Sequence, residues 1–208
     1  MVRRLGKPGA LRPIRDDRPV SDDGGSIAFD LDMTLVDSRP ASIRALERLA
    51  SEPGANLDIE ALMSVYGLPL PLWLPGEVDA ELFRTLQRED ASLAVAMPGA
   101  AAAFEAVRRA GARVVVVTAA PLQIAAAMLK ALGLVCDRLR ADVWAGAKVE
   151  PLREERCRAF VGDHEEDMLA AKQAGAIAVG VRTGTTRPFG ADVELGDLTE
   201  FPGWLEER

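Results

Sequence analysis

Short apolar runs alternate with longer amphipathic or Ala-rich segments over most of the chain. The clearest runs, at residues 27–29, 114–117, 159–161 and 178–181, have the composition of buried strands, and weaker strand signals lie at 142–144 and 192–195. Residues 100–109 predict a helix closed by Gly111, and residues 198–205 predict a terminal helical turn. Because strands that alternate with helices form parallel sheets covered on both faces, the pattern predicts a Rossmann-like, three-layer α/β core.

Residues 39–97 have the pattern of amphipathic helices rather than of buried strands. Apolar residues fall at helical spacing at Ile43, Leu46, Leu49, Leu62, Val65, Leu82 and Leu86. Breaks at residues 53–54, 69–75 and 76 divide the segment into several short helices. We therefore expect a small all-helical unit inserted after the first strand, with the core resuming at residue 98.

Residues 1–25 are rich in Arg, Pro and Gly and have almost no apolar periodicity, which predicts a disordered tail. A regulatory or partner-binding arm is the alternative. No continuous apolar stretch follows the first charges, so no signal peptide is expected, and no run is long enough to span a bilayer. These features predict a soluble protein with no membrane partner.

The composition narrows the choice of partners and compartment. At 208 residues, 49% of them hydrophobic, the chain is long enough for one core and a small accessory unit. Its formal charge of −7 argues against nucleic-acid binding, because phosphate backbones attract clustered Lys and Arg. Cys136 and Cys157 lack C-x-x-C spacing and indicate neither a zinc site nor a disulfide framework. Free thiols favour a cytoplasmic location.

Two carboxylates two residues apart, Asp30 and Asp32, follow the first predicted strand. In a parallel sheet this end of the strand opens onto the ligand crevice, where two acids repel each other unless a cation lies between them. Mg²⁺ suits such oxygen ligands and a phosphate substrate. One Asp is then available as nucleophile and the other as general acid and base. A solvated strand-end turn is the alternative interpretation.

Three later features have similar positions. Thr118 ends the second clear strand, where its hydroxyl and the following amides, beginning with Ala119, can hold phosphate oxygens; a simple strand terminus or N-cap is the alternative. Lys148 is a candidate to balance the charge of carboxylates and phosphate, although most lysines are only solvated. Asp163 and Asp167 follow the strand at 159–161, where Asp163 is alternatively an N-cap.

Taken together, these motifs resemble those of the haloacid dehalogenase-like (HAD) hydrolase superfamily. The resemblance covers roughly residues 27–184 and rests on D-x-D-x-T at 30–34, Thr118, Lys148 and G-D-x-x-x-D at 162–167. It implies that Asp30 is the nucleophile and that Asp32 is the general acid/base, whose backbone carbonyl also reaches Mg²⁺. It further implies that Thr118 and Lys148 bind phosphate and that Asp163 and Asp167 complete the metal site.

Within that superfamily, the chain looks most like the phosphoglycolate phosphatase branch. Residues 34–38, 167–175, 97–99 and the cap-loop sequence 67–70 carry this likeness, although a Gly-Pro helix stop also explains residues 67–69. The chain departs from the branch at Ala119, where Asn is usual, and in the short spacing from Lys148 to Asp163, which is closer to that of phosphoserine phosphatases.

Because Ala119 offers no side-chain hydrogen bond, we expect Arg39 and the cap loop to orient the substrate. The alternative is that Arg39 is a solvated hinge residue. His164 is either a metal ligand or, more simply, a solvent-facing residue of a helix first turn.

The resemblance therefore implies a Mg²⁺-dependent phosphatase of small phosphorylated metabolites. Its domains are expected to be a tail at 1–25, a core at 26–38 and 98–208, and a helical cap at 39–97. A phosphomutase acting on sugar phosphates shares the core motifs, and a catalytically idle module that binds phospho-ligands shares the fold; both remain open as alternatives. The sequence leaves the oligomeric state undetermined.

Overall fold

The computed structural model describes residues 25–52, 55–67, 70–182 and 187–208. The predicted disordered tail lies outside the described residues except for Gly25, and so do Leu68 and Pro69 of the predicted cap loop.

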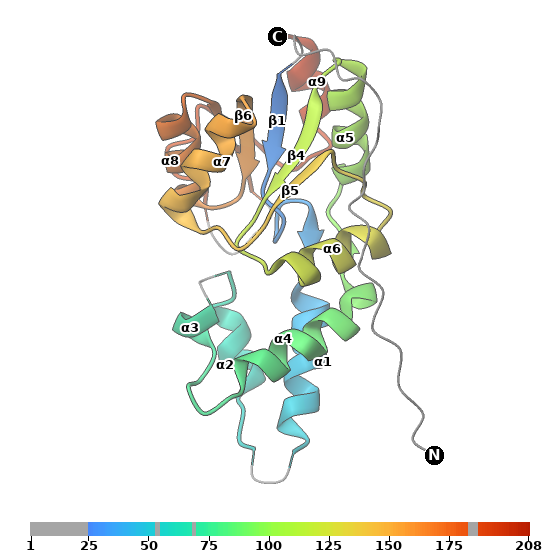
Figure 1. Cartoon of the computed structure of the whole chain (residues 1–208), viewed down its shortest axis with the longest axis vertical. Helices are drawn as coiled ribbons and strands as arrows, with labels where there is room; N and C mark the ends of the chain where they lie inside the picture. Colours follow the sequence, from blue (N-terminus) through green and yellow to red (C-terminus); the bar gives the residue numbers. More distant parts are fainter. Residues whose placement is uncertain (1–24, 53–54, 68–69, 183–186) are drawn as a thin grey trace, which may run out of the picture.

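Six strands form one parallel sheet in the order β5-β4-β1-β6-β7-β8 (Figure 1). They are β1 (Ser26–Phe29), β4 (Arg113–Val117), β5 (Arg138–Arg140), β6 (Cys157–Gly162), β7 (Ile177–Val181) and β8 (Val193–Leu195). The chain adds strands on one side of β1 as far as β5 and then crosses to the other side with β6. This reversal next to β1 is a topological switch point, where α/β sheets open a ligand crevice.

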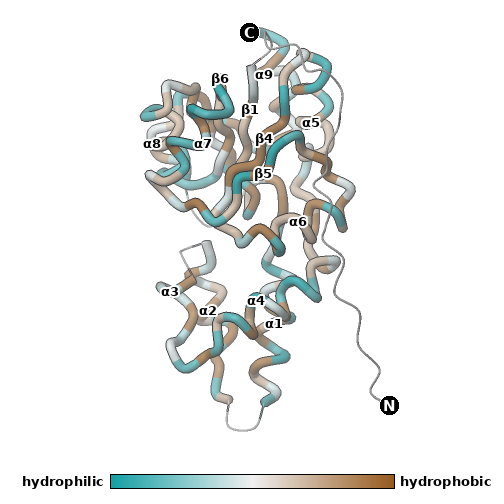
Figure 2. Tube along the Cα trace, viewed as in Figure 1, coloured by the Kyte–Doolittle hydropathy of each residue, from teal (hydrophilic) through white to brown (hydrophobic). Residues whose placement is uncertain are grey.

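Helices cover both faces of the sheet, as its alternating side chains require. Ile27 and Phe29 pack on one face with α5 (Ala100–Arg109), α6 (Leu122–Ala131) and α9 (Phe201–Glu206). Ala28 packs on the other face with α7 (Val149–Glu154) and α8 (Glu165–Ala174). Figure 2 shows the Val-rich β4 as a hydrophobic segment through the middle of the core. The predicted three-layer α/β fold is confirmed.

A helical cap lies at the end of the core toward which β1 points (Figure 1). Two short antiparallel strands, β2 (Val36–Asp37) and β3 (Val95–Ala96), pair where the chain leaves the core and returns. Between them lie α1 (Arg39–Ala50), α2 (Ile59–Ser64), α3 (Leu70–Trp73), α4 (Ala80–Glu89) and the 3-10 turn η1 (Ala91–Leu93). The cap has an apolar cluster of its own, which includes Leu46, Trp73 and Phe83. The predicted all-helical insert after the first strand is confirmed.

Two predicted details are wrong. Residues 142–144 form no strand; the strand is β5, four residues earlier, and Asp142 has a positive φ of 59°. This edge strand carries Arg138 and Arg140 and has no fully buried residue, so its sequence lacks the apolar run of a central strand. The Pro-rich break expected at 69–75 contains the single helical turn α3, which packs Trp73 into the cap cluster.

In the part of the chain that the structure describes, we find no helix that is both long and apolar enough to cross a membrane.

Gly99, where the returning chain enters α5, offers a test of this packing. Its φ is +85°, and an added Cβ would lie 2.3 Å from the Leu198 backbone. We expect Gly99→Ala to destabilise the protein by more than about 2 kcal/mol, because left-handed strain and a clash with backbone add together. Gly111, at φ +70° with open space around it, is the control, for which strain alone should cost about 1 kcal/mol. Urea unfolding of both Ala variants measures the difference, and equal losses would contradict the close approach at Gly99.

Candidate active site

The candidate active site lies where β1, β4 and β6 end side by side. Asp30 directly follows β1, and its N–H donates to the Val161 carbonyl at 2.8 Å, so that the hydrogen-bond ladder with β6 continues to this residue. Thr118 directly follows β4 and Asp163 follows β6. The parallel sheet therefore brings together polar residues that are far apart in the sequence.

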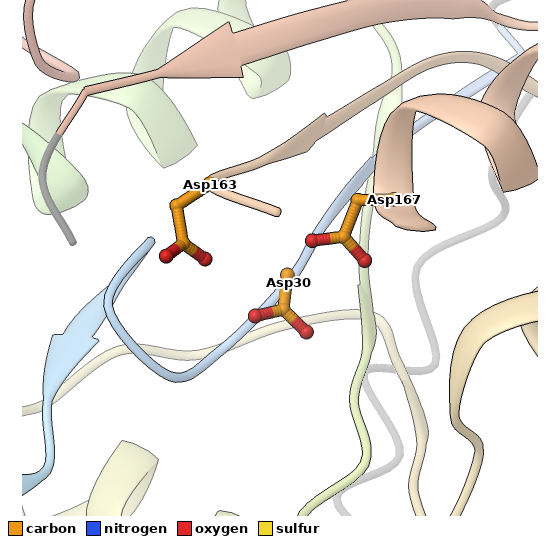
Figure 3. A group of neighbouring side chains, drawn as sticks. All are labelled: Asp30, Asp163 and Asp167. Atoms are coloured by element: carbon orange, nitrogen blue, oxygen red, sulfur yellow. The ribbon is translucent and has the colours of Figure 1, made fainter. Parts of the chain in front are cut away.

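Three of these carboxylates converge in one buried cluster (Figure 3). Asp30, Asp163 and Asp167 each offer a carboxylate oxygen, and the three oxygens lie within 4.8 Å of one another. The three residues are only 7%, 6% and 2% exposed. Asp167 comes from the first turn of α8, and Thr34 donates its hydroxyl to Asp163 at 3.3 Å.

Gly162 allows Asp167 to reach this cluster. An added Cβ at Gly162 would lie 2.5 Å from the Asp167 carboxylate oxygen, so any larger residue would displace the side chain. The glycine of the G-D-x-x-x-D motif is therefore explained by close packing between the end of β6 and the start of α8.

Lys148 joins two of the acids. It lies at the end of the 3-10 turn η2 (Ala145–Lys148), is 2% exposed, and donates from Nζ to Asp30 and Asp167, each at 2.7 Å. Burial alone would lower the pKa of Lys148, but the charges of Asp167 and Asp30 and their hydrogen bonds outweigh it and raise the pKa. Lys148 is therefore held as a cation within the acid cluster.

One lysine does not balance three buried carboxylates. Burial raises the pKa of Asp30 well above its usual value, Lys148 opposes this effect, and the charges of Asp167, Asp163 and Asp32 add to it. The arrangement needs further positive charge, and clustered carboxylate oxygens are the ligands that Mg²⁺ prefers. The donor set thus fits a hard divalent cation.

Asp32 has different surroundings from the three clustered acids. Its side chain accepts a hydrogen bond from the hydroxyl of Ser38, the N-cap residue of α1, where the core leads into the cap. Burial raises the pKa of Asp32, while the Ser38 hydrogen bond and the charge of Lys148 lower it less. The D-x-D motif therefore separates its two carboxylates, one within the acid cluster and one directed to the cap.

A cavity of about 300 Å³ lies between core and cap. The core contributes both acids of the D-x-D motif, Thr118, Ala119, Lys148, Asp163 and Asp167 to its lining. The cap contributes Tyr66, Gly67, Leu70, Pro71, Trp73, Phe83, Arg84 and Gln87. Gly67 and Leu70, the described ends of the predicted cap loop, therefore lie in the wall of the cavity.

Thr118 is fully buried, and its hydroxyl oxygen accepts the Ala120 N–H at 3.0 Å. It is not the N-cap of the following helix, because Pro121 has that position. His164, not Asp163, caps α8: its Nδ1 accepts the Glu166 N–H at 3.1 Å, and its ring lies 5.4 Å from that of Trp144. The capping alternatives considered for Thr118 and Asp163 are thus wrong.

Arg39 is the candidate residue that the structure does not bring to the cavity. It forms a two-pronged ion pair with Asp37, at 2.8 Å from Nε and 2.6 Å from Nη2, and its side chain is 43% exposed.

A different arginine, Arg84 of α4, lines the cavity, and its Nη1 is 3.8 Å from exposed Glu81. Among the described residues, no group hydrogen-bonds the buried Nε of Arg84.

Sequence reasoning missed Tyr66, Arg84 and Gln87. Phe83, Leu86 and Gln87 all lie on the buried side of α4, so the helical spacing of Leu82 and Leu86 marks the helix without identifying its inward polar residues. The only sign in the sequence that α4 has an inward polar residue is that Gln87 directly follows the apolar Leu86.

Comparisons with known proteins agree with this geometry. A model of the haloacid dehalogenase-like hydrolase family matches residues 26–175. A phosphoglycolate phosphatase from Cupriavidus necator is 28% identical over 218 residues, which cover 86% of this chain and 92% of that protein.

Solved structures share the fold. A hydrolase from Pseudomonas syringae has a TM-score of 0.68 at 22% identity and covers 88% of this chain and 98% of its own. CbbY from Rhodobacter sphaeroides, solved in complex with phosphate, has a TM-score of 0.64 at 22% identity. The match covers 85% of this chain and 95% of that one. Since the family model matches well over half of the sequence, the chain belongs to the haloacid dehalogenase-like hydrolase family.

Proposed function

We propose that the protein is a Mg²⁺-dependent phosphatase that hydrolyses small phosphate monoesters through an aspartyl-phosphate on Asp30. The observation that carries the proposal is the buried cluster of Asp30, Asp163 and Asp167, two of which accept hydrogen bonds from Lys148, in the wall of a cavity between core and cap. The cavity of about 300 Å³ suits a small substrate with its phosphate at the acid cluster.

In the first step, a carboxylate oxygen of Asp30 attacks phosphorus, and the bond from phosphorus to the ester oxygen breaks. Asp32 donates a proton to the leaving oxygen, which departs as an alcohol. The Thr118 hydroxyl, the Ala119 amide and the Lys148 ammonium hold the remaining phosphate oxygens and stabilise their charge.

In the second step, Asp32 takes a proton from water as the water oxygen attacks phosphorus. The bond between phosphorus and Asp30 breaks, which releases inorganic phosphate and restores the carboxylate. Asp30, Asp163, Asp167 and the backbone carbonyl of Asp32 would hold Mg²⁺, which supplies neutralising charge for the approach of two anions.

The domain division follows from the same proposal. Residues 26–38 and 98–208 form the catalytic core, and residues 39–97 form a cap that excludes water and contacts the leaving group. The paired strands β2 and β3 lie at both crossings between the two parts and are the proposed hinge.

The names of relatives support small phosphorylated metabolites as substrates, with phosphoglycolate as the first to test. A phosphomutase would pass the phosphoryl group to a second hydroxyl, so release of inorganic phosphate separates it from a phosphatase. An idle binding module would release none while still binding Mg²⁺.

Metal dependence is the first expected outcome. Phosphate release should require Mg²⁺, stop with EDTA and return on addition of Mg²⁺, whereas Ca²⁺ should inhibit because its looser coordination misplaces the nucleophile. Turnover after exhaustive chelation would contradict the site.

Mg²⁺ should also raise the melting temperature, because it relieves repulsion in the cluster. The folded pKa of Asp30 lies above its unfolded value, so its charge costs stability once the pH exceeds the unfolded pKa. Metal-free Asp30→Asn should therefore melt higher than metal-free wild type and respond less to Mg²⁺. Asp142→Asn, in the same cavity but outside the cluster, should keep the full response.

Substitution of each of the two acids of the D-x-D motif should impair turnover in a different way. Asp30→Asn should show no turnover and no phosphoenzyme, because an amide is a poor nucleophile. Asp32→Asn should lose about 10²- to 10⁴-fold in turnover, yet with p-nitrophenyl phosphate it should give a burst and accumulate phosphoenzyme, since this leaving group needs no proton. Intact mass after acid quench measures the added phosphoryl group, and label on Ser38 or Thr118 would contradict the assignment.

Arg84 should recognise a second anionic group on the substrate. Arg84→Ala should raise KM for phosphoglycolate by about 10- to 100-fold, the loss of a charged hydrogen bond of about 1.5–3 kcal/mol, with little change for p-nitrophenyl phosphate. Arg39→Ala tests the residue predicted from sequence, and its ion pair with Asp37 leads us to expect a smaller effect. Arg44→Ala, which removes an exposed cap arginine also paired three residues away, is the control. An equal rise in KM for both substrates in Arg84→Ala would contradict recognition of a second anionic group by Arg84.

A further inference from the structure

A continuous chain of hydrogen bonds runs through the cap and ends on Asp32. Gln87 Nε2 donates to the Ser42 hydroxyl at 2.8 Å, Ser42 and Tyr66 hydroxyls are 3.0 Å apart, and Tyr66 and Ser38 hydroxyls are 2.8 Å apart. Ser38 then donates to Asp32 Oδ1. Residues from α1, from α4 and from the turn after α2 thus connect to the core through one hydroxyl.

Proton accounting gives this chain a direction. An amide nitrogen only donates, and each hydroxyl has one proton and can also accept. With Asp32 as acceptor, Ser38 must take its own hydrogen bond from Tyr66, and Tyr66 must take one from Ser42. Ser42 Oγ also lies 3.1 Å from the Ser38 carbonyl, so that oxygen and the Tyr66 hydroxyl share its one proton. When Ser42 donates to Tyr66, the hydrogen bonds run in one direction from Gln87 to Asp32.

The four side chains that link the cap to Asp32 by hydrogen bonds are all buried. Ser38 and Ser42 are fully buried, and Tyr66 and Gln87 are each 9% exposed. Buried polar groups are costly unless paired, and apolar residues of similar shape could fill this space at little cost in stability. The Tyr66 ring also packs against Trp73 with ring centres 5.6 Å apart, so the cap places the hydroxyl rigidly.

We propose that Tyr66 and Gln87 are positioning residues for Asp32: through Ser42 and Ser38 they hold Asp32 Oδ1 toward the cap and leave Oδ2 to face the leaving group. The inference rests on the proposed acid/base role of Asp32. It makes the orientation of a core carboxylate depend on the position of the cap. Proton transfer would then be set up only when the cap lies over the substrate, because Ser38 is the link between the two parts.

The test uses Tyr66→Phe, which keeps the ring and removes the hydroxyl, and Gln87→Met, which keeps the approximate volume. On an alkyl phosphate, whose leaving oxygen needs a proton, each variant should lower kcat by about 10-fold with little change in KM, a fraction of the effect of general acid catalysis. On p-nitrophenyl phosphate, the burst should remain and phosphoenzyme should accumulate. Gln123→Met is the control, because it breaks the hydrogen bond from Arg88 of α4 to α6 without touching this chain.

A double-mutant cycle separates positioning from general damage. In an Asp32→Asn background, Tyr66→Phe should have no further effect on kcat, because the group that it positions is already gone. A further 10-fold loss in that background, or unchanged kcat in the single variant, would overturn the inference. An Asp32→Asn enzyme as active as wild type would instead refute the proposed role of Asp32.

A readout independent of turnover completes the test. Crystal structures of the Tyr66→Phe and wild-type proteins should differ at Asp32, with Oδ1 held by Ser38 in the wild type and a second side-chain rotamer in the variant. An Asp32 side chain that stays in place in both Tyr66→Phe and Gln87→Met would overturn the inference even if no substrate were turned over.

Discussion

Electrostatic repulsion among three buried carboxylates is the constraint on which the rest of the structure depends. Asp30, Asp163 and Asp167 lie within 4.8 Å of one another in a place that water barely reaches, and the ammonium of Lys148 compensates only part of their charge. A fold gains no stability from such a cluster, because desolvation of each charge costs several kcal/mol. The sheet, the buried lysine and the small residue at Gly162 together hold the acids in spite of this cost. A cation bound among the acids would relieve this repulsion and so stabilise the folded state.

Parallel topology explains how so much negative charge can be held in one place. Asp30, Thr118 and Asp163 each stand just past a mostly buried strand, so the hydrophobic core fixes the backbone while the polar group extends beyond it. Asp167 joins them from the first turn of α8. Backbone hydrogen bonds continue into the site at Asp30 and Thr118, which limits their movement. The repulsion therefore acts against the whole packed sheet rather than against a flexible loop, and the cluster cannot relax by moving apart.

Residues that directly follow buried strands could be predicted from the sequence, whereas residues placed by tertiary packing could not. Asp30, Thr118 and Asp163 were predictable because each follows an apolar run, and strand ends of a parallel sheet meet at one edge. Strand β5 was misplaced because an edge strand rich in Arg carries no apolar signal, and α3 was hidden among prolines. Arg84 and Gln87 were missed because packing against the core decides which side of a cap helix faces the cavity, and local periodicity does not contain that information. Tyr66 was missed because it lies in the turn after α2, outside any periodic segment. Arg39 was favoured by its place next to the motif, yet a nearby acid, Asp37, engages it instead.

The two parts of the protein satisfy opposite requirements at their junction. The core must hold its acids rigidly, whereas a proposed lid must move, and a cap with its own apolar cluster can shift without exposing the apolar core around the sheet. Polar contacts across the junction are suited to this task because they depend on direction, whereas apolar contacts tolerate sliding. The hydrogen-bonded hydroxyls that end on Asp32 would therefore couple the position of the cap to the acid that we propose protonates the leaving group. Asp30 and Asp167, which accept hydrogen bonds from Lys148, and Asp163, which accepts one from Thr34, would remain in place whether the cap is open or closed.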